Sequence, residues 1–116
     1  MDKRIERLHA MGCNTAEALE RMADDEAFYM DCLQEALKNP GFEGLERALA
    51  AGDTAAAFDC AHALKGVLGS VGLTPMFKKT TEIVEPLRAG RCDGLGGKLA
   101  ELMEMRLRFG EVVGPQ

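Results

Sequence analysis

One run of apolar residues limits the fold of this chain more than any other feature of its sequence. Between residues 54 and 71 the apolar positions recur at intervals of four, three, four and three residues. This is the spacing of a helix that packs along one side of a bundle. The positions are Ala57, Ala61, Leu64, Leu68 and Val71. Asp53 or Thr54 can cap this helix, Gly72 can end it, and no alternating strand pattern of useful length occurs, so we expect an all-α fold.

Capping and breaking signals divide the rest of the chain into further helices. Asp24 or Asp25 can begin a helix whose apolar stripe is Phe28, Cys32 or Leu33, and Leu37. Asn39-Pro40-Gly41 breaks that helix, and Thr74-Pro75 starts another one, because proline is well tolerated at a first helical position.

Short connections between neighbouring helices favour antiparallel packing. We therefore expect an antiparallel up-and-down four-helix bundle in residues 24–112 of a single domain, residues 1–116. One or two short accessory helices occupy residues 1–23 in this prediction, and residues 113–116 form a frayed tail.

Composition narrows the classes of function. The chain has 14 basic and 19 acidic residues, a net charge of −5, which does not favour a nucleic-acid partner. No apolar run is long enough for a membrane span, and the start does not resemble a signal peptide, so we expect a cytoplasmic protein. The surface shows no second long apolar seam, so we expect a monomer. The four cysteines are widely scattered and are expected to be free thiols. No phosphate-binding loop of the ATP-dependent type is present.

His62 lies outside the apolar seam of this helix. On a helical wheel it lies about 140° from the centre of the apolar seam. It is therefore expected in solvent, where an imidazole is a competent nucleophile near neutral pH.

The neighbours of His62 on the same face are chemically informative. Lys65, one turn away, can neutralise an anion carried by the imidazole, which points to a phosphoryl group as the electrophile. Gly66 and Gly69 each cost about 1 kcal/mol in a helix interior. At Gly66 we expect the missing side chain to let a partner protein approach, whereas Gly69 fits either partner access or close packing of a neighbouring helix. Asp59 orients the site or is an ordinary surface charge, and Phe58 offers an apolar docking contact or is buried.

The stretch AHALKGVLGSVGL, residues 61–73, resembles the histidine-containing phosphotransfer (Hpt) family of two-component signalling. The resemblance extends more loosely to residues 48–53 and 17–30 and to the helix from Thr74. The positions that match best are His62, Leu64, Lys65, Gly66, Gly72 and Leu73.

The resemblance implies a four-helix bundle and a relay function. It implies that His62 accepts a phosphoryl group from an aspartyl phosphate of a receiver domain and passes it to another receiver, in hybrid histidine kinases and response regulators. Lys65 would stabilise the phosphohistidine, and Gly66 would leave room for it, with Gly69, Phe58 and Asp59 at the docking surface. The chain itself would bind no cofactor, and the receiver would bring Mg²⁺.

Three alternatives remain beside this interpretation. A metal site is disfavoured because Cys60 and His62 lie about 200° apart on a helix, and Cys60 is better explained as a small packing residue. A hydrolase using His62 lacks a serine or acid at an obvious spacing. The third alternative is a non-catalytic helical adaptor that binds signalling proteins without being phosphorylated.

Overall fold

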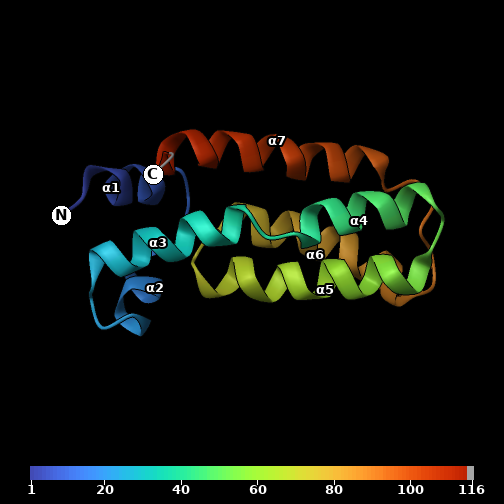
Figure 1. Cartoon of the computed structure of the whole chain (residues 1–116), viewed down its shortest axis with the longest axis horizontal. Coiled ribbons are helices and arrows are strands. Elements are labelled where there is room, and N and C mark those ends of the chain that lie inside the picture. The colour runs from blue at the N-terminus through green and yellow to red at the C-terminus, as the bar shows by residue number, and fades with distance from the viewer. Residues whose placement is uncertain (115–116) are drawn as a thin grey trace.

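Seven α-helices make up residues 1–114, the part of the chain that the computed structural model describes. No residue in this range belongs to a strand, which confirms the all-α class. None of the helices in this range is long and apolar enough to cross a membrane. Figure 1 shows the longer helices extending along the long axis of the molecule. The helices are α1 (Lys3–Ala10), α2 (Thr15–Arg21), α3 (Glu26–Leu37), α4 (Gly41–Ala50), α5 (Thr54–Ser70), α6 (Thr74–Arg88) and α7 (Gly96–Val113).

The predicted apolar seam of α5 forms the middle of the core. Its four helical positions are 0% exposed, and Val71, directly after the helix, is 4% exposed. Because α5 packs against α4 and α6, and α7 packs against α6 and α3, these side chains are enclosed on every side. Each fully buried leucine contributes roughly 1.5–3 kcal/mol to stability, so the seam holds α5 in one rotation about its axis.

The break between α3 and α4 occurs at the predicted proline. Pro40 has no N–H for the helical ladder, and the Asn39 Oδ1 atom accepts the backbone N–H of Gly41 at 2.7 Å. A Cβ on Gly41 would approach Leu64 Cγ to 3.1 Å, so the glycine lets the chain pass close to α5. After the break, α4 continues along the molecule from the end of α3 (Figure 1).

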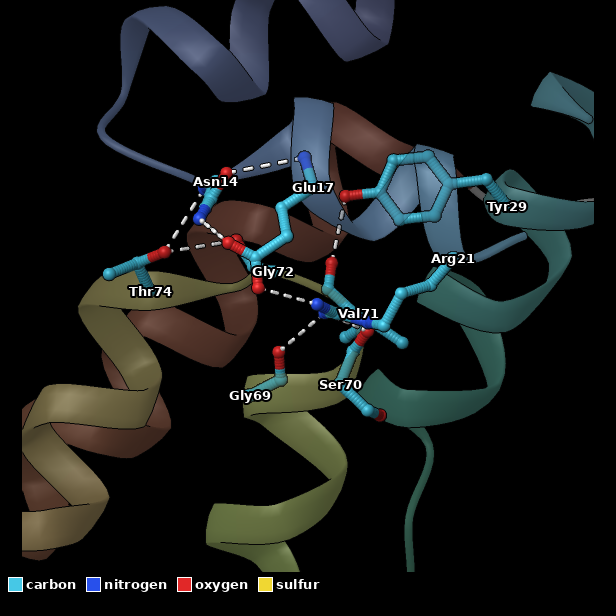
Figure 2. A network of polar contacts seen from close by, with 9 residues as sticks. All are labelled: Asn14, Glu17, Arg21, Tyr29, Gly69, Ser70, Val71, Gly72 and Thr74. Atoms are coloured by element: carbon cyan, nitrogen blue, oxygen red, sulfur yellow. Dashed lines mark hydrogen bonds and ion pairs between the residues drawn. The ribbon is translucent and has the colours of Figure 1, made fainter. Parts of the chain in front are cut away.

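The accessory helix α2 binds the end of α5 through polar contacts (Figure 2). Arg21 donates to the carbonyl oxygens of Ser70 at 2.9 Å and Gly69 at 3.3 Å. The last carbonyls of a helix lack partners within it, and a cation is favourable there. From α3, the buried Tyr29 hydroxyl donates to the Val71 carbonyl at 2.8 Å. These contacts fix the C-terminal end of α5 against the N-terminal segment.

The start of α2 meets the turn between α5 and α6 in the same network (Figure 2). The backbone N–H of Asn14 donates to Gly72 O and to Thr74 Oγ1, both at 3.0 Å. Gly72 has φ +72°, and a Cβ there would lie 2.4 Å from the carbonyl oxygen of Asn14. Only glycine therefore allows this close passage of the two backbones.

Two expectations from the sequence are wrong. Phe28 is 53% exposed, because α3 turns Tyr29, Met30 and Leu33 into the core instead. The C-terminal end is also more ordered than a frayed tail from residue 113, since α7 includes Val113, which is 1% exposed. Arg4 of α1 donates to the Val113 carbonyl at 3.0 Å, and α1 packs against α7 there. Residues 115–116 of the expected tail lie outside the described residues.

Candidate functional site

His62 lies on the exposed face of α5, as its place on the helical wheel predicts. The helix begins with Asp53, whose side chain accepts the backbone N–H of Ala56 at 3.1 Å. Because the seam faces the core, the opposite side of the helix is left to solvent. The imidazole is thus held in water on a rigid and well-capped element.

The His62 ring stacks on the ring of Phe58, one turn earlier on α5. The ring centroids are 5.4 Å apart, and the ring planes differ by 25°. Phe58 is half-buried, and the guanidinium carbon of Arg88, from the end of α6, lies 5.3 Å from its centroid. Arg88 also pairs with Glu85 at 3.6 Å. Two helices therefore contribute to the immediate surroundings of the imidazole.

Lys65 lies one turn after His62 and is half-buried. Its Nζ atom is 5.8 Å from the centroid of the Phe77 ring on α6, a distance at which the ring face attracts an ammonium. Among residues 1–114, no ion pair joins Lys65 to a carboxylate. The positive charge beside His62 is therefore available to an incoming anion.

The two glycines of this helix have different surroundings. A Cβ added at Gly66 would meet no atom within 4 Å, so Gly66 leaves open space next to His62. A Cβ at Gly69 would lie 2.9 Å from Cδ1 and 3.1 Å from Cε1 of Phe77. Close packing of α6 therefore explains Gly69, whereas no neighbouring atom explains Gly66.

Asp59 is exposed on α5 and makes no hydrogen bond or ion pair to another side chain in the described part of the chain. The half-buried Cys60 instead faces α4, where its Sγ would be 2.9 Å from a Cβ on Gly44. This contact fits the packing role expected for Cys60. Nowhere in residues 1–114 do three or more His, Cys, Asp or Glu side chains gather so that they could hold a metal ion.

Burial changes the acidity of two groups that lie away from His62. It raises the pKa of the Cys13 thiol to about 11 and the pKa of the Tyr29 phenol to about 12. Both groups therefore remain protonated at neutral pH. Neither Cys13 nor Tyr29 is therefore a candidate for thiolate or phenolate chemistry near neutral pH.

The structure brings Phe58, His62, Lys65 and Gly66 together along one side of α5, as the sequence predicts. Arg88 was not predicted, because it belongs to another helix and has no local motif. Phe77 and Arg88 are 11 residues apart, which places them on the same side of α6 about three turns apart. This shared face does not single out Arg88 without knowledge of how α6 packs on α5.

Comparison with known protein families gives one finding. A family model described as the Hpt domain matches residues 29–108. The matched range contains α5 and α6 in full and excludes α1 and α2. No curated protein and no solved structure matches the chain.

Proposed function

Because the chain belongs to the Hpt domain family, and so has a phosphotransfer role in two-component signalling, we propose that His62 is its phosphoryl-accepting residue. The proposed donor is the aspartyl phosphate of one receiver domain, and the proposed acceptor is the aspartate of another. The observation that carries this proposal is the exposure of His62 beside an ammonium and an open glycine. The expected receiver domains are those of hybrid histidine kinases and response regulators.

The proposed reaction is a direct displacement at phosphorus. The lone pair of an imidazole nitrogen forms the new N–P bond as the aspartyl O–P bond breaks. The aspartate leaves with the bonding electron pair as a carboxylate, and the other ring nitrogen keeps its proton. The second transfer reverses these changes, so the protein is a carrier and not an enzyme that turns over alone. Such a step depends mainly on in-line placement and on charge neutralisation.

Each neighbouring residue has a part in this proposal. The Lys65 ammonium, which has no carboxylate partner among the described residues, neutralises charge on the phosphohistidine. Gly66 lets the receiver approach the imidazole, and the exposed Asp59 and half-buried Phe58 contact it. Gly69 lies at the edge of this surface, where its main contact is the Phe77 ring. The receiver supplies Mg²⁺ from its own acidic site.

The scaffold, location and oligomeric state belong to the same proposal. The four members of an antiparallel up-and-down bundle are α3 with α4, α5, α6 and α7. This arrangement is supported by the packing of α4 on α5, α5 on α6, α6 on α7 and α7 on α3. The protein is expected to act as a cytoplasmic monomer.

A phosphorylated receiver domain with Mg²⁺ tests the proposal directly. The protein should take up the phosphoryl label in a form that is acid-labile and base-stable, as a phosphoramidate bond is. The His62→Gln variant should take up none. His9→Gln is the matched control, because His9 is exposed on α1 and should not affect labelling. A receiver that binds the protein without transferring label would favour the adaptor alternative, and turnover of a substrate without any receiver would favour a hydrolase.

A further inference from the structure

Three side chains form a row at the edge of the proposed site. His62 stacks on Phe58 at 5.4 Å between ring centroids, and Arg88 lies over the Phe58 ring at 5.3 Å. His62 and Phe58 come from α5, whereas Arg88 comes from the last turn of α6. Because it contacts both the imidazole and the guanidinium, Phe58 is the central member of the row.

The contacts in this row restrict the His62 side chain, which would otherwise move freely. An exposed side chain changes rotamer within picoseconds to nanoseconds, and a histidine on an open helix face has several orientations available. A stacked aromatic pair favours its stacked arrangement by about 2- to 12-fold, and a cation over a ring is favoured by about 2- to 5-fold at exposed sites. Contacts of this size favour the stacked orientation of the imidazole several-fold over the others.

We propose that Phe58 is a positioning residue for His62 and that Arg88 acts through Phe58. This inference rests on the proposed function, since it concerns the rate at which His62 captures a phosphoryl group. Phe58 holds the imidazole in one orientation before the donor arrives, and Arg88 holds Phe58 from the side of α6. Pre-orientation of a nucleophile lowers the barrier without a new contact to the phosphoryl group.

The competing explanation is that Phe58 acts only through its contact with the receiver and does not orient His62. An open pocket of about 400 Å³ adjoins Phe58 and Arg88, lined also by Thr54, Ala55, Leu87 and Gly90. A receiver side chain could fill this pocket, and Phe58 would then matter only when the donor is a protein. The two explanations therefore differ in what they predict for a donor too small to dock.

Phosphoramidate is a donor that is too small to dock. Its P–N bond breaks with loss of ammonia as the imidazole N–P bond forms. We expect Phe58→Leu to slow labelling by phosphoramidate several-fold, because the stacked orientation of the imidazole is then no longer favoured over the others. Phe58→Tyr should restore the rate because it keeps the stacking ring. Arg88→Gln should give an intermediate rate. Phe28→Leu and Arg91→Gln are the matched controls, since both residues are exposed and lie outside the row.

The NMR spectrum of the folded, unlabelled protein gives a second readout. The stacked Phe58 ring should shield the carbon-bound protons of His62, and Phe58→Leu should move these resonances downfield while the core resonances stay in place. Labelling of Phe58→Leu by phosphoramidate at the wild-type rate would overturn the proposal, even if labelling by the receiver became slow. If neither the phosphorylated receiver nor phosphoramidate labels the wild-type protein, the proposed function is overturned instead.

Discussion

The difference between Gly66 and Gly69 gives a quantitative prediction. Both residues lie inside α5, so replacing either with alanine gains about 1 kcal/mol of intrinsic helix stability. At Gly66 the new methyl group meets nothing within 4 Å, and the full gain should appear in the free energy of unfolding. At Gly69 the methyl group would lie 2.9 Å from the Phe77 ring, and overpacking of this kind costs about 1–3 kcal/mol. The net effect at Gly69 should therefore be between zero and a loss of about 2 kcal/mol.

Urea denaturation followed by circular dichroism measures this difference. Gly66→Ala should be the more stable variant by about 1–3 kcal/mol, with an unchanged dependence on urea concentration. In a Phe77→Ala background, Gly69→Ala should become stabilising, because the ring that it would meet is gone. Equal stabilisation by the two alanines in the wild-type background would refute the packing explanation for Gly69.

A substitution at Gly66 also separates the stability of the fold from the access of a receiver to His62. Gly66→Leu should fold, yet it should block transfer from a phosphorylated receiver, because the side chain fills the space beside His62. Labelling of the same variant by phosphoramidate should continue, since that donor needs little room. Normal transfer from the receiver in Gly66→Leu would remove the argument that the open space at Gly66 serves a partner.

Three further predictions follow from the contacts and burial of single residues. Lys65→Ala should weaken uptake or retention of the phosphoryl label while the fold is unchanged. Lys78→Ala, at an exposed position on α6, should leave labelling unchanged. Equal labelling kinetics in the two variants would refute the role of Lys65. Tyr29→Phe should lower the free energy of unfolding by about 1–3 kcal/mol in urea titrations, because the buried Val71 carbonyl loses its 2.8 Å hydrogen bond; an unchanged midpoint would show that this bond is not needed. Burial raises the pKa of Cys13 from 9.0 to about 11, so stability should be full below pH 9 and should fall as the pH rises towards 11. In that window the unfolded chain has released the thiol proton and the folded chain has kept it, which gives a slope of at most about 1.4 kcal/mol per pH unit. Cys13→Ala should reduce this slope in urea titrations at several pH values, and an identical slope would contradict the burial argument.

Local patterns were sufficient to predict α5 and the orientation of its residues. A seam with helical periodicity has only one rotation that buries all of its members, so the exposed position of His62 followed from the residues around it. The caps and breaks at Asp53, Pro40 and Gly72 depend on backbone chemistry within a few residues of each position. Such features are encoded locally and can be read from the sequence alone.

Features that depend on contact between distant segments were left open or were not predicted. On α3, both Phe28 and Tyr29 begin an apolar stripe, and the spacing does not choose between them. The structure buries Tyr29 because its hydroxyl reaches the Val71 carbonyl, which lies 42 residues away in sequence. The contact of Arg88 with Phe58 and that of Phe77 with Gly69 likewise depend on how α6 packs on α5.

Transfer of the phosphoryl group out of the protein tests the central claim most directly. The protein labelled by one receiver is purified, mixed with a second, unphosphorylated receiver and Mg²⁺, and followed by peptide mapping and by the label on each protein. The account predicts that the label is on the peptide that contains His62 before mixing and moves to the second receiver afterwards. Label on any other residue, or label on His62 that no receiver can remove, would contradict it.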